Sequence, residues 1–327
     1  MAVRNPVRPA ISVEILDLRH FSSADLRPLL AQEVQLWGKT LSWDYRSSSE
    51  MILRYVDAKI LPGYAAVERG SLMGYAFFVY EGSKGVIGDL FVAPGRSDVR
   101  AVEIRLLDHM IETLQQSPGI HRVEAQLLAH PTGELAEPFL ANGFQRFRRL
   151  FLQLGLSGSV NSPLSLSRTS NHIHIRGWQE QDYQSAASVI TASYRAHIDS
   201  EINDQYLTSA GSLRFLNNIV RFPGCGVFDP EASFVATHQQ TNSLVGLILC
   251  SRVRDDVGHV TQVCVLPEHR GEGLGESLLA CTCDALRARR FNLLTLTVTE
   301  ANHRAVDLYR KLGFEAGRVF DAFVWDG

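Results

Sequence analysis

Residues 263–275 read Val-Cys-Val-Leu-Pro-Glu-His-Arg-Gly-Glu-Gly-Leu-Gly, and this stretch decides the fold. An apolar strand ends at a proline turn, and Arg270 and three glycines then open a helix. Glycine lets the backbone approach a bulky group and adopt dihedral angles that other residues avoid. The free N–H groups of a first helical turn, together with the helix dipole, favour negative charge. The stretch therefore predicts a site for an anion such as a pyrophosphate, with Arg270 as a permanent cation.

The composition is that of a globular protein with enough length for two hydrophobic cores. The chain has 327 residues, of which 45% are hydrophobic and 20% charged. Its net charge of −3 gives no indication of a nucleic-acid or membrane-surface partner. No apolar run approaches the roughly 20 residues of a spanning helix, and residues 1–10 lack the apolar stretch of a signal peptide. We expect a cytoplasmic protein that is a monomer or a homodimer.

The cysteines form neither a disulfide framework nor a metal site. All of them lie in the second half of the chain: Cys225, Cys250, Cys264, Cys281 and Cys283. Cys281 and Cys283 stand two positions apart on an expected helix and therefore point in different directions. We expect reduced thiols and no bound metal.

The two halves of the chain repeat one order of elements. Each half has a strand ending at a proline, then a helix, a strand and a Gly-Phe pair. The first copy comprises 87–92, 101–115, 122–128 and 143–144, and the second comprises 260–266, 273–290, 293–299 and 313–314. Equal order at nearly equal spacing indicates an internal duplication. We expect domains at 1–155 and 172–327, joined by a Ser-, Gly- and Asn-rich linker at 156–171.

Each half is expected to be a mixed α/β domain. A first strand, early helices and three strands precede the repeated helix, strand, helix and final strands. In the second half, the first strand is expected at 172–177 and the first helix over 182–197. This order predicts a central, mostly antiparallel sheet flanked by helices.

At this point the sequence resembles a tandem member of the GNAT superfamily, the acyl-CoA-dependent N-acyltransferases. Arg270-Gly-Glu-Gly-Leu-Gly275 fits the Gln/Arg-x-x-Gly-x-Gly/Ala signature of that superfamily. Its second motif is matched by Asn302, Ala305, Leu308, Tyr309, Gly313 and Phe314. The Gly-x-Gly-x-x-Gly turn and the Gly-Lys-Ser/Thr loop of other nucleotide sites do not fit.

The resemblance implies a site for acetyl-CoA in the second domain. The backbone of Val263, Cys264 and Val265 would bind the pantetheine arm. The pyrophosphate would lie on Arg270, Gly271, Glu272, Gly273, Leu274 and Gly275. Asn302 would cap the following helix and reach the cofactor. Tyr309 would lie beside the CoA sulfur as general acid, whereas the apolar stripe around it is equally typical of a core tyrosine.

The residues that activate and bind the acceptor amine are less clear from the sequence. Many members of the superfamily carry a glutamate on the strand before the proline, but residues 259–266 contain no carboxylate. The candidate bases are Glu300, His259 and an ordered-water relay. The alternative interpretation of His259 is a surface residue at the start of a strand. Contacts with the acceptor are expected from Tyr194, Asp199, Glu201, Asp204 and Tyr206. The alternative interpretation of this stretch is a solvated helix end.

The first domain has lost these features. When the two prolines are aligned, Ser97, Asp98, Arg100 and Val102 stand where the second copy has Arg270 and its three glycines. Phe139 stands at the position of Tyr309. We therefore expect the first domain to be degenerate, and the second to transfer acetyl to a primary amine by direct attack in a ternary complex. Transfer of a longer acyl chain and a non-catalytic acetyl-CoA-binding module remain the alternatives.

Overall fold

The computed structural model describes residues 13–95, 97–157, 172–221 and 226–327. Within these residues the chain divides into two compact units. One contains residues 13–33, Glu50–Val123 and Gly327, and the other contains the described parts of Val34–Ser49 and Glu124–Asp326. Most of the expected linker, residues 158–171, lies outside the described residues, as does Cys225.

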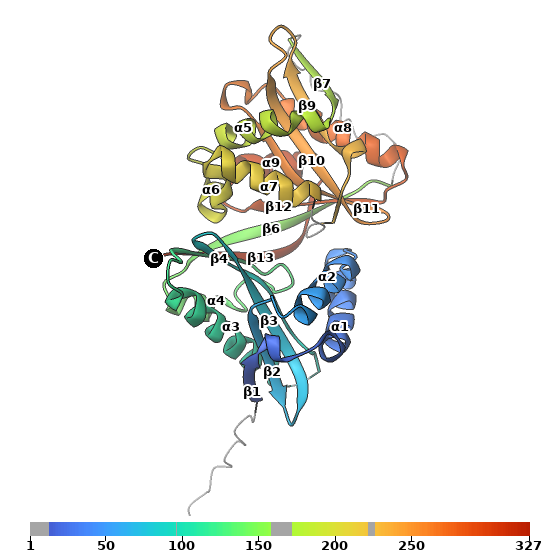
Figure 1. Cartoon of the computed structure of the whole chain (residues 1–327). Coiled ribbons are helices and arrows are strands. Elements are labelled where there is room, and N and C mark those ends of the chain that lie inside the picture. The colour runs from blue at the N-terminus through green and yellow to red at the C-terminus, as the bar shows by residue number, and fades with distance from the viewer. Residues whose placement is uncertain (1–12, 96, 158–171, 222–225) are drawn as a thin grey trace, which may run out of the picture. The chain divides into compact units, whose positions relative to one another are not determined.

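The same order of elements occurs twice, as the sequence predicts (Figure 1). The first series is β1 (Val13–Asp17), η1 (Leu18–His20), α1 (Ser23–Leu41), α2 (Arg46–Asp57), β2 (Gly63–Glu68), β3 (Ser71–Glu81), β4 (Lys84–Val92), α3 (Val99–Gln116), β5 (Arg122–Gln126), α4 (Ala136–Ala141) and β6 (Gln145–Gly155). The second opens with β7 (Ile173–Gly177), η2 (Glu180–Asp182), α5 (Tyr183–Ser193), α6 (Ile198–Ile202), η3 (Asp204–Leu207), α7 (Ser209–Arg221), β8 (Val227–Phe228) and η4 (Pro230–Ala232). It ends with β9 (Phe234–His238), β10 (Leu244–Arg254), β11 (Val257–Val265), η5 (Pro267–His269), α8 (Leu274–Ala288), β12 (Leu293–Thr299), α9 (His303–Lys311) and β13 (Glu315–Asp326).

Two of the early helices were not predicted correctly. The sequence analysis does not predict helix α2. The helix expected over 182–197 ends at Ser193, because Ala196 has a positive φ of 54° and His197 is in an extended conformation. His197 then acts as the N-cap of the separate helix α6.

The first unit is built on a run of antiparallel strands in the order β1-β2-β3-β4. Helix α3 packs against β2, β3 and β4. Its buried side chains include Leu106, Leu107 and Met110, which together with Tyr75 and Leu90 form the interior of this unit. The α/β prediction for this half is confirmed.

The second unit contains strands in the order β13-β6-β12-β11-β10-β9-β7. Only β11 and β12 in this run are parallel neighbours. Strand β6 comes from the predicted first domain, yet it pairs along its length with β12 and β13. The boundary expected at residue 155 therefore does not coincide with the division into compact units, because strand pairing places β6 in the second one.

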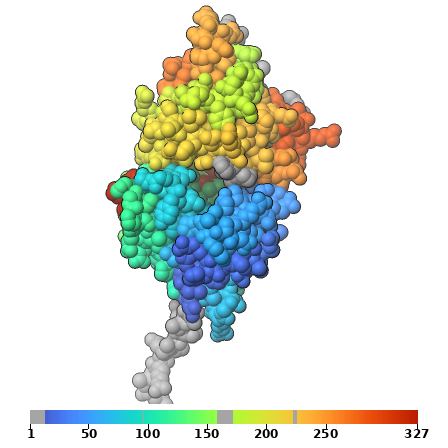
Figure 2. Space-filling view, in the orientation of Figure 1, coloured from blue at the N-terminus to red at the C-terminus, as the bar shows by residue number. Residues whose placement is uncertain are grey.

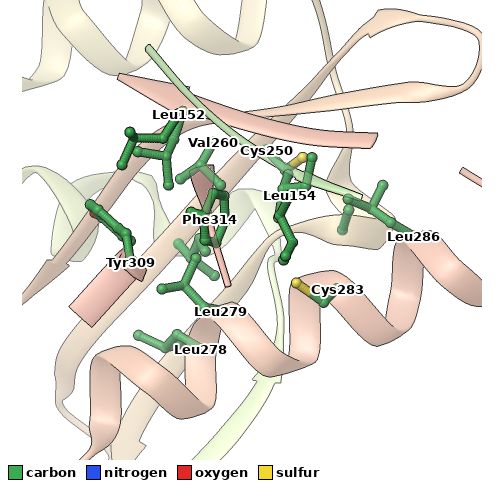
Figure 3. Packing of buried hydrophobic residues seen from close by; sticks show 14 of the residues in the cluster. Leu152, Leu154, Cys250, Val260, Leu278, Leu279, Cys283, Leu286, Tyr309 and Phe314 are labelled. Carbon is green, nitrogen blue, oxygen red and sulfur yellow. The ribbon is translucent and has the colours of Figure 1, made fainter. Parts of the chain in front are cut away.

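Helices cover both faces of this second sheet. Side chains of α8 and α9, among them Leu278, Leu279 and Tyr309, pack with Leu152 and Val260 on one face (Figure 3). On the other face, side chains of α5 and α7 pack on Leu247, Leu249 and Cys264. In the space-filling view, the green-to-yellow residues of α5 and α7 form part of the visible surface of the second unit (Figure 2). The site described below lies between these two sets of helices, at the end of β11.

Candidate active site

A cavity of about 620 Å³ lies in the second unit. Its walls come from β11 and β12, the start of α8, helix α9, the early helices α5–α7 and strand β6. The sequence-predicted residues in its lining are Tyr194, Asp199, Tyr206, His259, Val263, Cys264, Val265, Arg270, Gly271, Gly273, Leu274, Gly275, Asn302 and Tyr309. Glu201, Asp204, Glu272 and Glu300 do not line it.

The cavity opens where β11 and β12 part. The two strands pair from Val257 to Val260 on β11 and from Leu293 to Leu296 on β12, and the described register extends no further. A register shift against β10 occurs at the same point, between Leu249 and Cys250. Residues 261–265 of β11 therefore keep β10 as a neighbour on one edge and have no strand on the other. Backbone N–H and C=O groups at such an edge are available to a ligand.

The glycines after β11 form the turn into α8. Gly271 and Gly273 have φ values of 91° and 76°, and Gly273 is the N-cap residue of the helix. Non-glycine residues rarely adopt these angles. Because Gly273 has no side chain with which to cap the helix, the first N–H groups of α8 are left for an anion. The predicted anion site thus has the expected backbone. Glu272 is turned aside instead, with its carboxylate 44% exposed and 4.0 Å from His269 Nδ1.

Arg270 does not have the role that the sequence predicts for its side chain. Its Nε donates to the carbonyl oxygen of Val265 at 3.2 Å, and its Nη2 donates to that of Ser193 at 2.6 Å. The guanidinium therefore joins the end of β11 to the end of α5. Arg304, on the first turn of α9, is the cation beside the glycines, with Nη2 3.9 Å from the point where a Cβ on Gly271 would stand. Arg304 is exposed and forms no ion pair with a described residue.

Tyr309 and Asn302 occupy the wall formed by α9. Asn302 is the N-cap, and its side-chain oxygen accepts a hydrogen bond from the Ala305 N–H at 3.3 Å. Tyr309 is 6% exposed and packs edge-on against Phe314, with ring centroids 5.7 Å apart. Burial raises the pKa of the Tyr309 phenol above its ordinary value, so the hydroxyl is protonated at neutral pH. The tyrosine thus belongs both to the core and to the cavity wall.

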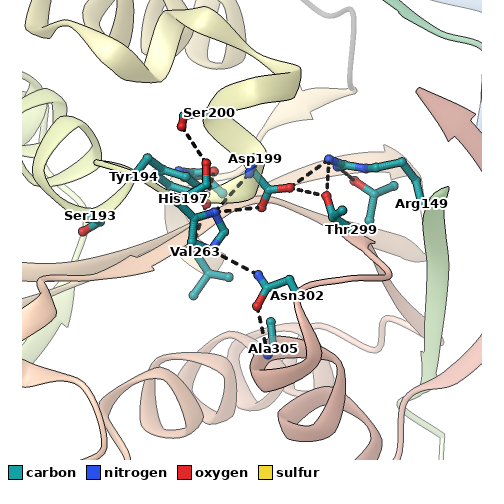
Figure 4. A network of polar contacts seen from close by, with 12 residues as sticks. Arg149, Ser193, Tyr194, His197, Asp199, Ser200, Val263, Thr299, Asn302 and Ala305 are labelled. Carbon is teal, nitrogen blue, oxygen red and sulfur yellow. Dashed lines mark hydrogen bonds and ion pairs between the residues drawn. The ribbon is translucent and has the colours of Figure 1, made fainter. Parts of the chain in front are cut away.

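The opposite wall combines aromatic rings with one buried ion pair (Figure 4). Tyr194 and Tyr206 stack with ring centroids 4.3 Å apart. Asp199 accepts hydrogen bonds at Oδ1 from Arg149 Nη1, at 3.2 Å, and from Thr299 Oγ1. Arg149 and Asp199 are only 12% and 16% exposed.

Comparison with known proteins identifies this arrangement. Residues 197–314, which include the glycine turn, Asn302 and Tyr309, match the acetyltransferase (GNAT) family. The match places residues 197–314, which are less than half of the chain, in the GNAT superfamily. The resemblance proposed from the two motifs is therefore confirmed.

The individual relatives are similar to this chain over limited stretches. Mycothiol acetyltransferase of Thermobifida fusca is 39% identical over 97 residues, which are 27% of this chain and 30% of the relative. A putative ribosomal-protein alanine N-acetyltransferase of Bacillus subtilis is 34% identical over 67 residues, 20% of this chain and 44% of the relative. The matched stretch thus spans less than half of either relative.

A solved structure extends the similarity of fold to nearly the whole chain. The tandem GNAT protein from the clavulanic acid biosynthesis pathway superposes with a TM-score of 0.61 at 17% identity. The match covers 96% of this chain and 98% of that protein. The tandem GNAT architecture expected from the internal repeat is thus supported by a structural neighbour.

Neither sequence-predicted base has the surroundings expected of a GNAT base. Glu300 is 40% exposed, pairs with Arg148 at 3.2 Å and does not line the cavity. His259 is buried rather than on the surface, with its Nδ1 2.8 Å from Thr295 Oγ1 and its ring against Trp43 and Phe151. Burial lowers the pKa of His259 to about 3. A group of that basicity is too weak to deprotonate an amine.

The acceptor residues are also fewer than predicted, and some were missed. Of the three predicted carboxylates, Asp199 alone lines the cavity. Glu201 is exposed on α6, and the backbone N–H of Asp204 donates to Glu124 Oε1 at 3.2 Å. Polar residues in the lining that the sequence analysis did not name include Arg149, His197, Gln262 and Arg304. Gln262 and Arg304 lie beside the two motifs and were within reach of local reasoning. Arg149 belongs to β6, and no local signal connects it with this cavity.

Among the described residues, no helix is long and apolar enough to cross a membrane. No group of three or more potential metal ligands occurs in that part of the chain either.

Proposed function

We propose that the second unit transfers the acetyl group of acetyl-CoA to a primary amine, of a small molecule or a protein, by direct attack in a ternary complex. The observation that carries the proposal is a single cavity lined by the free edge of β11, the glycine turn and Tyr309. The names of two relatives, a mycothiol acetyltransferase and a ribosomal-protein alanine N-acetyltransferase, support acetyl transfer, and the second supports an amine acceptor.

In this proposal acetyl-CoA lies along the parted strands. The backbone of Val263–Val265 binds the pantetheine amides, and the N–H groups of residues 271–275 bind the pyrophosphate. Arg304 supplies the positive charge that we first assigned to Arg270, because it is the cation beside Gly271. Arg270 acts indirectly by holding β11 against the end of α5.

The chemistry needs a neutral amine and a stabilised leaving thiolate. The nitrogen lone pair attacks the thioester carbonyl carbon, a C–N bond forms and the C–S bond breaks. The nitrogen of the neutral amine loses one proton and the sulfur gains one, so atoms and charge balance. An acceptor that arrives as an ammonium ion first gives its additional proton to solvent water. Tyr309 donates its hydroxyl proton to the sulfur and is restored by the proton that leaves the nitrogen. No cysteine intermediate is required, and burial raises the pKa of the Cys264 thiol to about 12, which keeps it an unreactive thiol.

The test is acetyl-CoA consumption by the full chain against a panel of primary amines, with Tyr309→Phe beside the wild type. Acetylation by the wild type and its loss in the variant would support the proposal. Tight CoA binding with no acetylated amine would instead indicate a binding module. Faster turnover with propionyl- or octanoyl-CoA would indicate a longer-chain acyltransferase.

We also propose that the first half binds no acetyl-CoA. Helix α3 begins after Asp98, and Arg100 pairs with Glu103 at 2.9 Å on its first turn. The residue at the third glycine position, Val102, is 1% exposed. An acidic residue and a filled first turn disfavour a phosphate there. Calorimetry of the full chain should therefore give one CoA per chain, and a stoichiometry of two would refute this.

A further inference from the structure

The amine end of the cavity contains one carboxylate, and one of its oxygens is fixed (Figure 4). Asp199 Oδ1 accepts from Arg149 and from Thr299. Oδ2 has no hydrogen-bond donor among the described residues, and the nitrogen recorded beside it is His197 Nδ1, at 3.6 Å. The carboxylate is therefore held from one side, and its second oxygen is available to a ligand.

His197 does not compensate the charge of that oxygen. Burial lowers the pKa of the His197 imidazole below its ordinary value, so the ring is neutral at pH 7. Its Nδ1 lies 3.2 Å from the Asp199 N–H, and its Nε2 lies 3.3 Å from Asn302 Nδ2. Because Nδ1 accepts the Asp199 N–H, addition of a second proton at Nδ1 would break that hydrogen bond.

Apart from Arg149, several uncharged aromatic and aliphatic side chains line the same cavity as Asp199. Tyr206 stacks on Tyr194 and meets Phe215 edge-on, with ring centroids 5.0 Å apart. Burial raises the pKa of both phenols, so neither ring carries charge at neutral pH. Ile202 and Ile219 complete this part of the lining. An ammonium group beside such rings is stabilised by their faces, and an attached carbon frame by apolar contact.

A second ammonium group would have no counter-charge here. Glu276, the other carboxylate in the lining, lies on the first turn of α8, directly after the glycine turn, and pairs with Lys311 at 3.1 Å. Arg149, which holds Asp199, is itself positive and only 12% exposed. Like charges in a partly buried site repel strongly because solvent screens them poorly.

We propose that the acceptor is a monoamine whose single ammonium group docks on Asp199 Oδ2 and whose neighbouring carbon frame is apolar or aromatic. Polyamines are excluded. Arg149 and Thr299 are positioning residues that act through Asp199. The inference rests on the proposed function for its account of turnover, but the docking of the amine is measurable without turnover.

The experiment titrates amines into the full chain saturated with CoA, by calorimetry, so that no acetyl group is transferred. The probes are 2-phenylethylamine and spermidine. We expect 2-phenylethylamine to bind at least about tenfold more tightly than spermidine, although spermidine carries more charge. Asp199→Asn should weaken the binding of 2-phenylethylamine by about 30-fold or more, with CoA binding unchanged.

The positioning role is tested at Thr299. Thr299→Val removes one donor to Asp199 and should weaken amine binding by about tenfold, whereas Thr299→Ser, which keeps the hydroxyl, should restore it. A purely structural role of the threonine would not give this rescue. Asp284→Asn is the matched control for Asp199→Asn, because Asp284 lies on α8 with its side chain 70% exposed. This control should bind 2-phenylethylamine as tightly as the wild type does.

Three results would overturn the inference. They are spermidine binding as tightly as 2-phenylethylamine, no binding of either amine, or a loss in Glu201→Gln equal to that in Asp199→Asn. Failure of the proposed function is distinguishable from these. In that case 2-phenylethylamine binds and depends on Asp199, but no amine is acetylated when acetyl-CoA replaces CoA.

Discussion

Replacement of Tyr309 by phenylalanine separates a chemical role from a packing role. The change removes one oxygen, and that hydroxyl makes no hydrogen bond to a described residue. The ring contact with Phe314 is kept, because both residues remain aromatic. Since no hydrogen bond is lost, the free energy of unfolding should change by less than about 1 kcal/mol.

The catalytic cost should be much larger. Loss of a positioned general acid lowers kcat by about 10²- to 10⁴-fold, which raises the activation free energy by roughly 2.7–5.4 kcal/mol. Because burial raises the pKa of Tyr309, the wild-type acid stays protonated throughout the alkaline range, and kcat should show no alkaline limb from this residue below about pH 10.

The assay is release of free CoA thiol, with thermal unfolding and CoA calorimetry on the same samples. Tyr80→Phe, at a tyrosine 48% exposed on β3, is the matched control and should keep wild-type kcat. The reasoning is refuted if Tyr309→Phe keeps wild-type kcat. It is equally refuted if the loss of rate comes with a matching loss of stability or of CoA binding.

Three further predictions follow from the surroundings of single side chains. Arg304→Met should weaken acetyl-CoA binding by about tenfold in calorimetry. Arg270→Met should mainly lower the unfolding temperature, because its guanidinium joins β11 to α5. A larger loss of acetyl-CoA binding in Arg270→Met than in Arg304→Met would restore Arg270 as the phosphate ligand. Cys264→Ala should keep kcat within about threefold, since direct attack bypasses a thiol whose pKa is raised to about 12, and an acetylated Cys264 found by mass spectrometry would contradict this. His259 has a pKa of about 3 when folded, against an ordinary value near 6.5, so the unfolded chain alone binds this proton as the pH falls from 6.5 toward 3. Between pH 8 and pH 5, the free energy of unfolding of the wild type should therefore fall by about 2 kcal/mol more than that of His259→Asn. Urea titrations that give equal falls in the two proteins would refute this.

The glycine turn, the cap and the tyrosine were predictable because their signals are local. Gly271 and Gly273 are required by backbone angles that depend on a few neighbouring residues. Asn302 caps a helix that starts at the next residue, and Tyr309 follows on the same helix. The repeated order of elements likewise depends on periodicity and turns, which a short window of residues contains.

The partners of charged side chains depended on tertiary structure. Arg270 binds the carbonyl of Ser193, 77 positions away, and Arg149 reaches Asp199 because β6 pairs with β12. The pairing sets Arg149 opposite Thr299 and so assembles the ion pair. A charged side chain on a long, flexible stem takes whichever partner the fold brings near, and sequence separation does not restrict that choice. Local sequence therefore determined the glycine turn and the helix start that we propose as the anion site, whereas strand pairing decided which carboxylate Arg149 holds in the cavity lining.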